Sequence, residues 1–346
     1  VLWGGIPNPD LKWETTSQYD IGVDMAFFEE RLSLTFDYYK KQTKDLLRER
    51  ILSPSSSYDR IWINNGEIAN EGVELSINAN LIENDNFSLS SSIIFFANEN
   101  EVVDLGGVAE SGLTTDPNTG MRFEYSGVSL EQFRQYPNIL AVGQPVNVFY
   151  GFRTDGIIQN LQEGIDAGLD GELAQPGEFK YVDVNGDGII NLDDRTIIGD
   201  PNPDFNLSLG LNLDYKNFDF SVFFNGSFGQ DVINTQRFNQ PSNLPLRWTL
   251  DNPTNEYPRL RDGRQTYFSD WWVENGSFVR LQNLTFGYSI PLNESFINKA
   301  RIYVNGNNLY TFTDFEGYDP EVGTDGIYWG GYPRLRQVTI GLDLNF

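Results

Sequence analysis

The sequence contains no cysteine and no histidine. The lack of cysteine excludes a disulfide framework, a thiolate metal site and a cysteine nucleophile within these 346 residues. The lack of histidine excludes the Ser-His-Asp triad, histidine-ligated zinc and the usual general base near neutral pH. Paired carboxylates are left as a catalytic device, but no pair stands out among the 49 acidic residues. The sequence therefore predicts that the chain is not an enzyme.

Basic residues and long hydrophobic runs are also scarce. Lys and Arg number 24 against 49 Asp and Glu, so the formal net charge is −25. A nucleic-acid partner is excluded, because phosphates would be repelled and no basic block exists to release counterions. No apolar run reaches the roughly 18 residues of a transmembrane helix. The opening stretch VLWGGIPNPDLKW lacks the pattern of a signal peptide, and we expect a further N-terminal part before it.

What the chain does contain is a repeated strand pattern, with aromatic residues at 14%. In NLSLGLNLDY, Leu207, Leu209, Leu211 and Leu213 alternate with polar residues. Such period-two alternation predicts strands with one apolar face. We predict nine strands, near 15–27, 32–43, 67–81, 87–98, 205–215, 218–228, 278–290, 300–312 and 335–346. Most have about 10 residues or more, the length that a tilted strand needs to cross a bilayer.

The connections between the predicted strands alternate in length. The short ones are 28–31, 83–86, 216–217 and 293–299, and the long ones are 44–66, 99–204, 229–277 and 313–334. Outer-membrane barrels have short periplasmic turns and long extracellular loops. The predicted fold is therefore all-β. The chain is expected to contribute about nine strands to a transmembrane antiparallel β-barrel, with 99–204 as a large extracellular insertion. The alternative is a soluble secreted β-rich protein that binds glycans or mediates adhesion, with one face of its sheet exposed to solvent.

Aromatic residues gather at the ends of the predicted strands. The pairs are Phe27 and Phe28, Phe95 and Phe96, Tyr215 and Phe218, and Tyr310 and Phe312. They are interpreted as the interfacial girdles of a barrel, although aromatics are common in any β core. The terminal Phe346 on an alternating strand is typical of outer-membrane barrels.

The segment DVNGDGIINLDD, residues 183–194, resembles a calcium loop. The oxygen ligands would come from Asp183, Asn185, Asp187, Ile189, Asn191 and Asp194, which occupy loop positions 1, 3, 5, 7, 9 and 12. Gly188 at position 6 would make the sharp turn, and Asp instead of Glu at position 12 makes the affinity uncertain. The alternative is an Asn/Asp/Gly turn that binds nothing. We expect a structural Ca²⁺ that fixes a long loop, without a signalling role.

Tryptophans and arginines are concentrated in the 229–277 connection. Trp248, Trp271 and Trp272 are candidates for stacking on sugar rings, with Trp62 and Trp329 in other long connections. The alternatives for these rings are packing within the loop and contact with a partner. The arginines of this connection are Arg247, Arg259, Arg261 and Arg264. They are expected to pair with loop carboxylates or to meet an acidic substrate or partner.

Several stretches together resemble the SusC/RagA-type TonB-dependent outer-membrane transporters. They are NPDLKWETTSQYDIGVDMAFFEERLSLTFDYYKKQTKDLL, NNGEIANEGVELSI, DVNGDGIINLDDRTIIGDPNPDFNLSLG, FVRLQNLTFGYSIP, RIYVNGNNLYTFTDFEGYDPE and the final GLDLNF. They occur in this order over nearly the whole chain, and their combination is more specific than any one of them.

The resemblance implies a barrel of about 22 strands filled by an N-terminal plug. It also implies coupling to TonB, a SusD-type lipoprotein lid, and import of oligosaccharides or peptides across the outer membrane of a Gram-negative bacterium. The plug, the TonB-contacting segment and the earlier strands are not in this sequence. Residues 1–346 are therefore expected to be the C-terminal part of such a barrel and not to transport by themselves.

Overall fold

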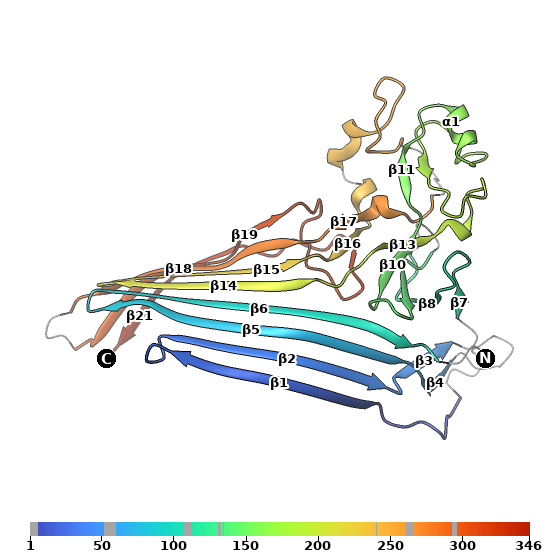
Figure 1. The fold of residues 1–346 in the computed structure, drawn as a ribbon. Helices are drawn as coiled ribbons and strands as arrows, with labels where there is room; N and C mark the ends of the chain where they lie inside the picture. The colour runs from blue at the N-terminus through green and yellow to red at the C-terminus, as the bar shows by residue number, and fades with distance from the viewer. Residues whose placement is uncertain are drawn as a thin grey trace.

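Nine long strands form one antiparallel sheet in the order β1-β2-β5-β6-β14-β15-β18-β19-β21 (Figure 1). The structure, a computed structural model, describes residues 6–51, 60–106, 113–130, 133, 135–239, 241–260, 266–292 and 296–346. The strands are β1 Thr15–Phe27, β2 Leu32–Lys44, β5 Glu67–Asn84, β6 Phe87–Asp104, β14 Phe205–Tyr215, β15 Phe218–Phe228, β18 Phe278–Ile290, β19 Lys299–Thr313 and β21 Gln337–Asn345. All nine predicted strands are confirmed, and each pairs with its neighbours in chain order.

The largest difference from the predicted strands is the length of the β5–β6 hairpin. β6 runs to Asp104, so the insertion begins at residue 105 and not at 99 as predicted. Polar residues interrupt the apolar alternation there, but the pairing with β5 continues, with Glu71 opposite Glu99. Backbone hydrogen bonds hold two paired strands together, so the pairing can extend beyond the residues in which apolar and polar side chains alternate.

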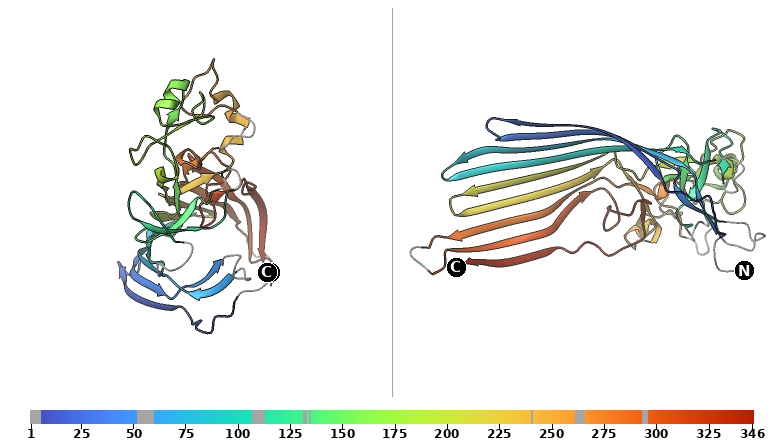
Figure 2. Two further views of the ribbon diagram at one scale, coloured as in Figure 1. Left: turned by 90° about the vertical axis from the view of Figure 1, so that its right-hand side faces the viewer. Right: turned by 90° about the horizontal axis from the view of Figure 1, so that it is seen from below.

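Short and long connections lie at opposite ends of the sheet (Figures 1 and 2). β21 ends beside the short turns, whereas the insertion and the other long connections gather at the far end. The sheet is curved. Within the described chain, each of its edge strands, β1 and β21, pairs with one neighbouring strand only. The nine strands therefore form part of a wall and not a closed barrel. No helix in the described ranges is both long and apolar enough to cross a membrane.

The two faces of the sheet differ in chemistry. Leu213 lies opposite Leu89 and Phe220 on its two neighbouring strands, and directly opposite residues share a face. One position earlier, Asn212 lies opposite Ser90 and Ser221. We call the face that carries Leu213 the apolar face and the other the polar face.

No second sheet covers the apolar face in the part of the chain that the structure describes. On β21, Val338, Ile340 and Leu342 are 68%, 78% and 59% exposed. A soluble sandwich would bury this face against another layer. The exposed apolar face is the arrangement of a barrel wall that faces lipid and differs from that of a soluble sandwich.

Aromatic rings form a band at each end of the apolar face. Phe95, Phe205, Phe228, Tyr310 and Phe312 lie toward the long connections, and Phe87, Tyr215, Phe218 and Tyr288 toward the short turns. Successive rings are close, with centroids 4.8 Å apart for Phe205 and Phe228. The bands are ten residues apart on β14, about 33 Å along the strand, which a tilt of about 40° reduces to roughly 25 Å.

The predicted aromatic pairs are thus corrected at two positions. Phe96 follows Phe95 directly and therefore lies on the polar face, because neighbouring residues of a strand point to opposite sides. Phe28 lies in the turn after β1, with φ of 56°. The predicted girdle is otherwise where the pattern placed it.

The long connections fold into a body of their own, which we call the loop module (the described parts of 105–204, 229–277 and 314–336). It contains the five-stranded sheet β13-β10-β9-β8-β7 and the smaller sheets β17-β16-β20 and β11-β12. Their bounds are β7 Thr114–Thr115, β8 Arg122–Ser126, β9 Asn138–Ala141, β10 Val148–Gly151, β11 Thr154–Ile157, β12 Phe179–Tyr181, β13 Thr196–Gly199, β16 Asp231–Asn234, β17 Val273–Asn275 and β20 Ile327–Tyr328. The described chain also has one α-helix, α1 Leu161–Asp166, and four short 3₁₀ helices, Leu192–Asp194, Arg237–Asn239, Pro241–Leu246 and Asp270–Trp272. A separate hairpin, β3 Leu47–Ile51 with β4 Arg60–Asn64, follows β2. Most of the deeply buried hydrophobic residues lie in the module and not in the sheet.

Candidate functional site

The polar face carries a chain of neutral hydrogen-bonding side chains. Asn283 Nδ2 donates to Asn307 Oδ1 at 2.9 Å, and Asn307 Nδ2 donates to Asn305 Oδ1 at 2.8 Å. Asn305 Nδ2 donates in turn to Thr285 Oγ1 at 2.7 Å. We call these four residues of β18 and β19 the amide wall, and their amide and hydroxyl groups carry no charge. Further along the same face, Arg301 pairs with Asp219 and Asp343.

One arginine of the polar face ties the loop module to the sheet. Arg280 on β18 is 3% exposed, and its guanidinium reaches Asp319 Oδ1 at 2.7 Å and Glu321 Oε2 at 2.6 Å. Arg334 binds the same two carboxylates at 3.0 and 2.7 Å. Arg280 lies opposite Asn225 and therefore on the same face as the amide wall. These contacts hold the 314–336 connection over the polar face.

Sequence reasoning missed this anchor. The available signal was an arginine within an alternating strand, at a position where the other strands carry Ser, Asn or Thr. The acidic partners follow some 40 residues later, and no local pattern links them to Arg280.

Two of the three candidate tryptophans are buried. Trp248 is 7% exposed and packs with Phe152 and Phe179, while its Nε1 donates to Gln159 Oε1 at 2.9 Å. Trp272 is 3% exposed and packs in a second hydrophobic cluster of the module. The expectation that these rings are open for stacking is therefore wrong in this conformation, and packing within the loop describes them.

The other tryptophans differ in exposure. Trp271 is partly buried between both clusters, and the Arg237 guanidinium lies 4.6 Å from its ring centroid. Trp62 and Trp329 are 49% and 53% exposed. Of the tryptophans within the module, Trp329 thus presents the most open ring.

The predicted arginine cluster is divided. Arg259 Nε lies 2.8 Å from Glu178 Oε1, and Glu178 is 1% exposed, so the expected internal ion pair is confirmed there. Arg247 is buried instead against the ring of Phe238, 4.0 Å from its centroid, and donates to the Phe238 carbonyl. Arg261 and Arg264 lie outside the described residues.

The calcium-type loop is closed by its own backbone. The Asp183 carboxylate accepts hydrogen bonds from the N–H groups of Gly186 and Gly188, both at 2.7 Å. These two glycines have φ of 76° and 82°, which favours glycine at both turns. The N–H of Gly188, followed by that of Gly186, holds the pKa of Asp183 below its usual range, so this carboxylate stays ionised.

The last position of the loop is folded inward. Asp194 is fully buried and accepts from Val184 N at 2.9 Å and Asn191 N at 2.8 Å. The atoms that would coordinate a metal ion are oxygens, as calcium requires. Within the described residues, however, no three acidic, histidine or cysteine side chains come together as metal ligands would. The loop has the chemistry of a calcium site, but its carboxylates face backbone N–H groups.

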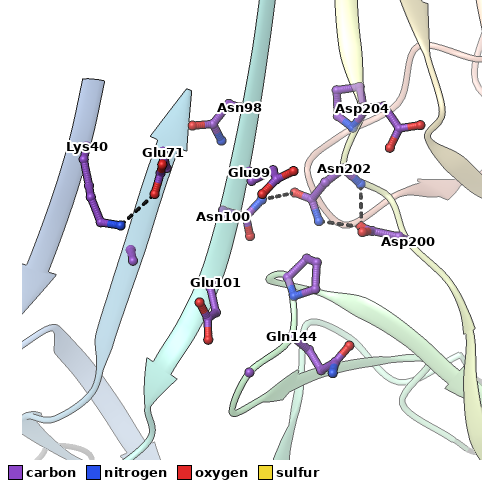
Figure 3. Close-up of a pocket in the computed structure, with 14 residues that line it drawn as sticks. Lys40, Glu71, Asn98, Glu99, Asn100, Glu101, Gln144, Asp200, Asn202 and Asp204 are labelled. Carbon is purple, nitrogen blue, oxygen red and sulfur yellow. Dashed lines mark hydrogen bonds and ion pairs between the residues drawn. The ribbon is translucent and has the colours of Figure 1, made fainter. Parts of the chain in front are cut away.

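A cavity of about 580 Å³ lies beside the free edge of β6, where β14 has not yet begun (Figure 3). Asn100 Nδ2 donates to Asn202 Oδ1 at 2.9 Å across it, and Asn202 Nδ2 donates to Asp200 at 2.7 Å. Lys40 is paired with Glu71 at 2.7 Å. The lining also contains Glu99, Glu101 and Asp204. These carboxylates disfavour an anion and suit groups that donate hydrogen bonds.

Comparison with known proteins gives a consistent result. The family described as "TonB dependent receptor-like, beta-barrel" matches residues 2–309. TonB-dependent receptor P3 of Formosa agariphila is 37% identical, over 100% of this chain and 35% of the relative. TonB-dependent receptor SusC of Bacteroides thetaiotaomicron is 30% identical, over 98% of this chain and 32% of the relative. The solved structure of the RagAB peptide transporter matches with a TM-score of 0.77 at 26% identity, over 99% of this chain and 36% of that chain.

This chain thus spans about a third of the length of these relatives. TonB-dependent receptors are outer-membrane proteins of Gram-negative bacteria, and they are transporters and receptors, not enzymes. In that setting the apolar face with its two aromatic bands contacts lipid, and the polar face lines the lumen. The chain belongs to the TonB-dependent receptor family, within the group of SusC and RagA, and forms part of the barrel wall with its extracellular loops.

Proposed function

We propose that the protein containing this chain imports a nutrient across the outer membrane in a TonB-dependent manner. The observation that carries the proposal is the uncharged amide wall of β18 and β19 on the polar face, which leads toward the folded loop module anchored by Arg280. A polar solute can move along such a wall by exchanging hydrogen bonds, and TonB acting through a plug would supply the energy.

Oligosaccharides are the proposed substrates, with peptides as the second candidate. Amide and hydroxyl groups on the wall suit sugar hydroxyls. The peptide alternative is favoured by the likeness to the RagAB peptide transporter. A SusD-type surface lipoprotein is the proposed partner, and the loop module, which lies at the end of the sheet with the long connections, is its proposed contact surface (Figure 1).

The function is tested by uptake in cells that carry the complete protein and its lipoprotein. We expect fluorescent neutral oligosaccharides to accumulate when TonB is present and not when it is deleted. Accumulation that is the same without TonB would contradict the proposal. Accumulation of labelled peptides instead of oligosaccharides would establish the second candidate.

We further propose that residues 183–194 bind a structural Ca²⁺ through Asp183, Asn185, Asp187, Ile189, Asn191 and Asp194. The oxygen ligands at these six positions, with Gly188 at the sharp turn, support it. The ion would fix the insertion where it returns to β13 and then to β14.

Asp183→Ala with Asp187→Ala is expected to expose residues 177–200 to proteolysis and to leave the barrel intact. The change removes carboxylates that accept N–H groups, so some loosening is expected even without calcium. Calcium dependence is therefore the decisive readout. We expect calcium to slow cleavage of the parent protein and of the control Asp193→Ala, whose exposed side chain is outside the ligand set. If calcium and chelator leave the parent's cleavage unchanged, the loop is only a turn.

A further inference from the structure

A second cavity lies within the loop module, between residues 236–239 and 242 on one side and the 314–336 connection on the other. Its volume is about 340 Å³, and its lining includes Gln236, Asn239, Ser242, Glu316, Tyr318 and Tyr328. We call it the tyrosine pocket. This volume is at the lower end of the range of small-molecule sites, which suits one ring-sized unit of a longer ligand.

The position of the pocket follows from the Arg280 anchor. Tyr318 directly precedes Asp319, whose carboxylate is held by Arg280 on the polar face. The pocket therefore lies next to the residues that Arg280 ties to the polar face of the sheet. A ligand bound there would be at the extracellular entrance of the proposed import path.

The lining combines open aromatic surface with neutral polar groups. Tyr318 is 75% exposed, and its backbone N–H donates to the Tyr328 hydroxyl at 3.3 Å, which fixes the two residues relative to each other. Asn239 and Ser242 are exposed beside them. The flat face of a tyrosine packs against C–H groups, while amide and hydroxyl side chains serve as donors and acceptors.

The described lining of the tyrosine pocket contains a carboxylate and no cationic side chain that could pair with an anion. Glu316 contributes a carboxylate to the lining, and none of the lining residues that the structure describes is Lys or Arg. Arg237 lies nearby, but its guanidinium is engaged with Glu274 at 3.5 Å and Glu316 at 3.6 Å. The lining, as far as the structure describes it, therefore offers no cation to a uronate or sulfate group.

The geometry points to a subsite for a neutral sugar unit, with one ring face packed on Tyr318 and its hydroxyls bonded to Asn239, Ser242 and Glu316. This inference rests on the proposed import of oligosaccharides, and it adds both the place of capture and a selection of neutral over anionic sugars. Free peptides fit the chemistry less well, because their C-terminal carboxylate would lack a cationic partner among the described residues of the lining.

The test uses the complete transporter with its lipoprotein and measures binding by calorimetry. The neutral probes are malto-, cello- and xylo-oligosaccharides, and the anionic probe is a sulfated carrageenan oligosaccharide. Tyr318→Ala is expected to weaken binding of the neutral probe with the highest affinity by about tenfold, the size of a well-packed aromatic contact. Tyr332→Ala, on the same connection and fully exposed at 102%, is the matched control and should change the affinity less than about twofold.

A second variant tests the selection against anions. Asn239→Lys adds a cation to the lining at an exposed side chain, so it should raise affinity for the sulfated probe and leave the fold intact. Equal binding by the Tyr318→Ala and Tyr332→Ala proteins, or no gain with Asn239→Lys, would overturn the subsite. If TonB-dependent uptake of neutral probes persists in that case, the proposed function stands without this subsite. If the parent protein takes up no oligosaccharide, the proposed import of oligosaccharides itself fails.

Discussion

Leu209→Arg is expected to destabilise the folded barrel by about 2 to 4 kcal/mol, the cost of a cationic side chain at the bilayer midplane. Leu209 lies near the middle of β14 on the apolar face, opposite Ile93 and Phe224. An arginine there would place its charge in hydrocarbon or distort the wall to reach water. The effect is measured as the urea concentration at which the complete protein loses its heat-modifiable migration in lipid vesicles.

Ser208→Arg is the matched control for that experiment. Ser208 is the neighbouring residue at almost the same depth, but it lies on the polar face. Its arginine would extend into the lumen, where charge is tolerated, so the shift should be much smaller. Equal losses at both positions would contradict the assignment of the two faces.

Asp319→Asn with Glu321→Gln is expected to release the 314–336 connection from the sheet. Arg280 is 3% exposed, so neutralising both partners leaves a buried guanidinium without an anion. Breaking a buried ion pair in this way costs about 3 to 5 kcal/mol. The expected result is faster amide hydrogen exchange across 314–336, with little change in the middle of the nine strands.

The control for this anchor is Arg334→Gln. The Arg334 side chain is 46% exposed and binds the same carboxylates from the solvent side. Exposed ion pairs contribute about 1 kcal/mol or less, so exchange in 314–336 should change little. If Arg334→Gln opens the connection as much as the double variant does, the buried Arg280 is not the anchor.

The nine strands were predictable because their pattern is local and repeated. Leucines at every second position of β14 identify the strand and its apolar face without any tertiary knowledge. The error at Phe96 arose from treating adjacent aromatics as one girdle, although neighbouring residues in a strand face opposite ways. The extension of β6 to Asp104 was missed because pairing with β5, and not a hydrophobic pattern, maintains it.

The loop module was far less predictable, because its core joins residues that are distant in the chain. Trp248 is buried against Phe152 and Phe179, roughly 70 to 100 positions earlier, and no periodicity in the 229–277 connection indicates it. The short strands β9 and β10 did leave a signal in the apolar runs ILAV and VFYGF between turn residues. The tyrosine pocket could not be predicted, because two separate connections form it.

The most direct measurement of the central claim is a spin-label scan along β14 in the complete protein in lipid vesicles. The chain has no cysteine, so each introduced thiol is unique within it. Labels at Leu207, Leu209, Leu211 and Leu213 should collide often with oxygen dissolved in the lipid and rarely with a water-soluble nickel chelate. Labels at Ser208, Asn212 and Asp214 should show the reverse, so that accessibility alternates with a period of two. Nickel collisions of equal frequency at both sets of positions would contradict a barrel wall with one lipid face and one lumen face.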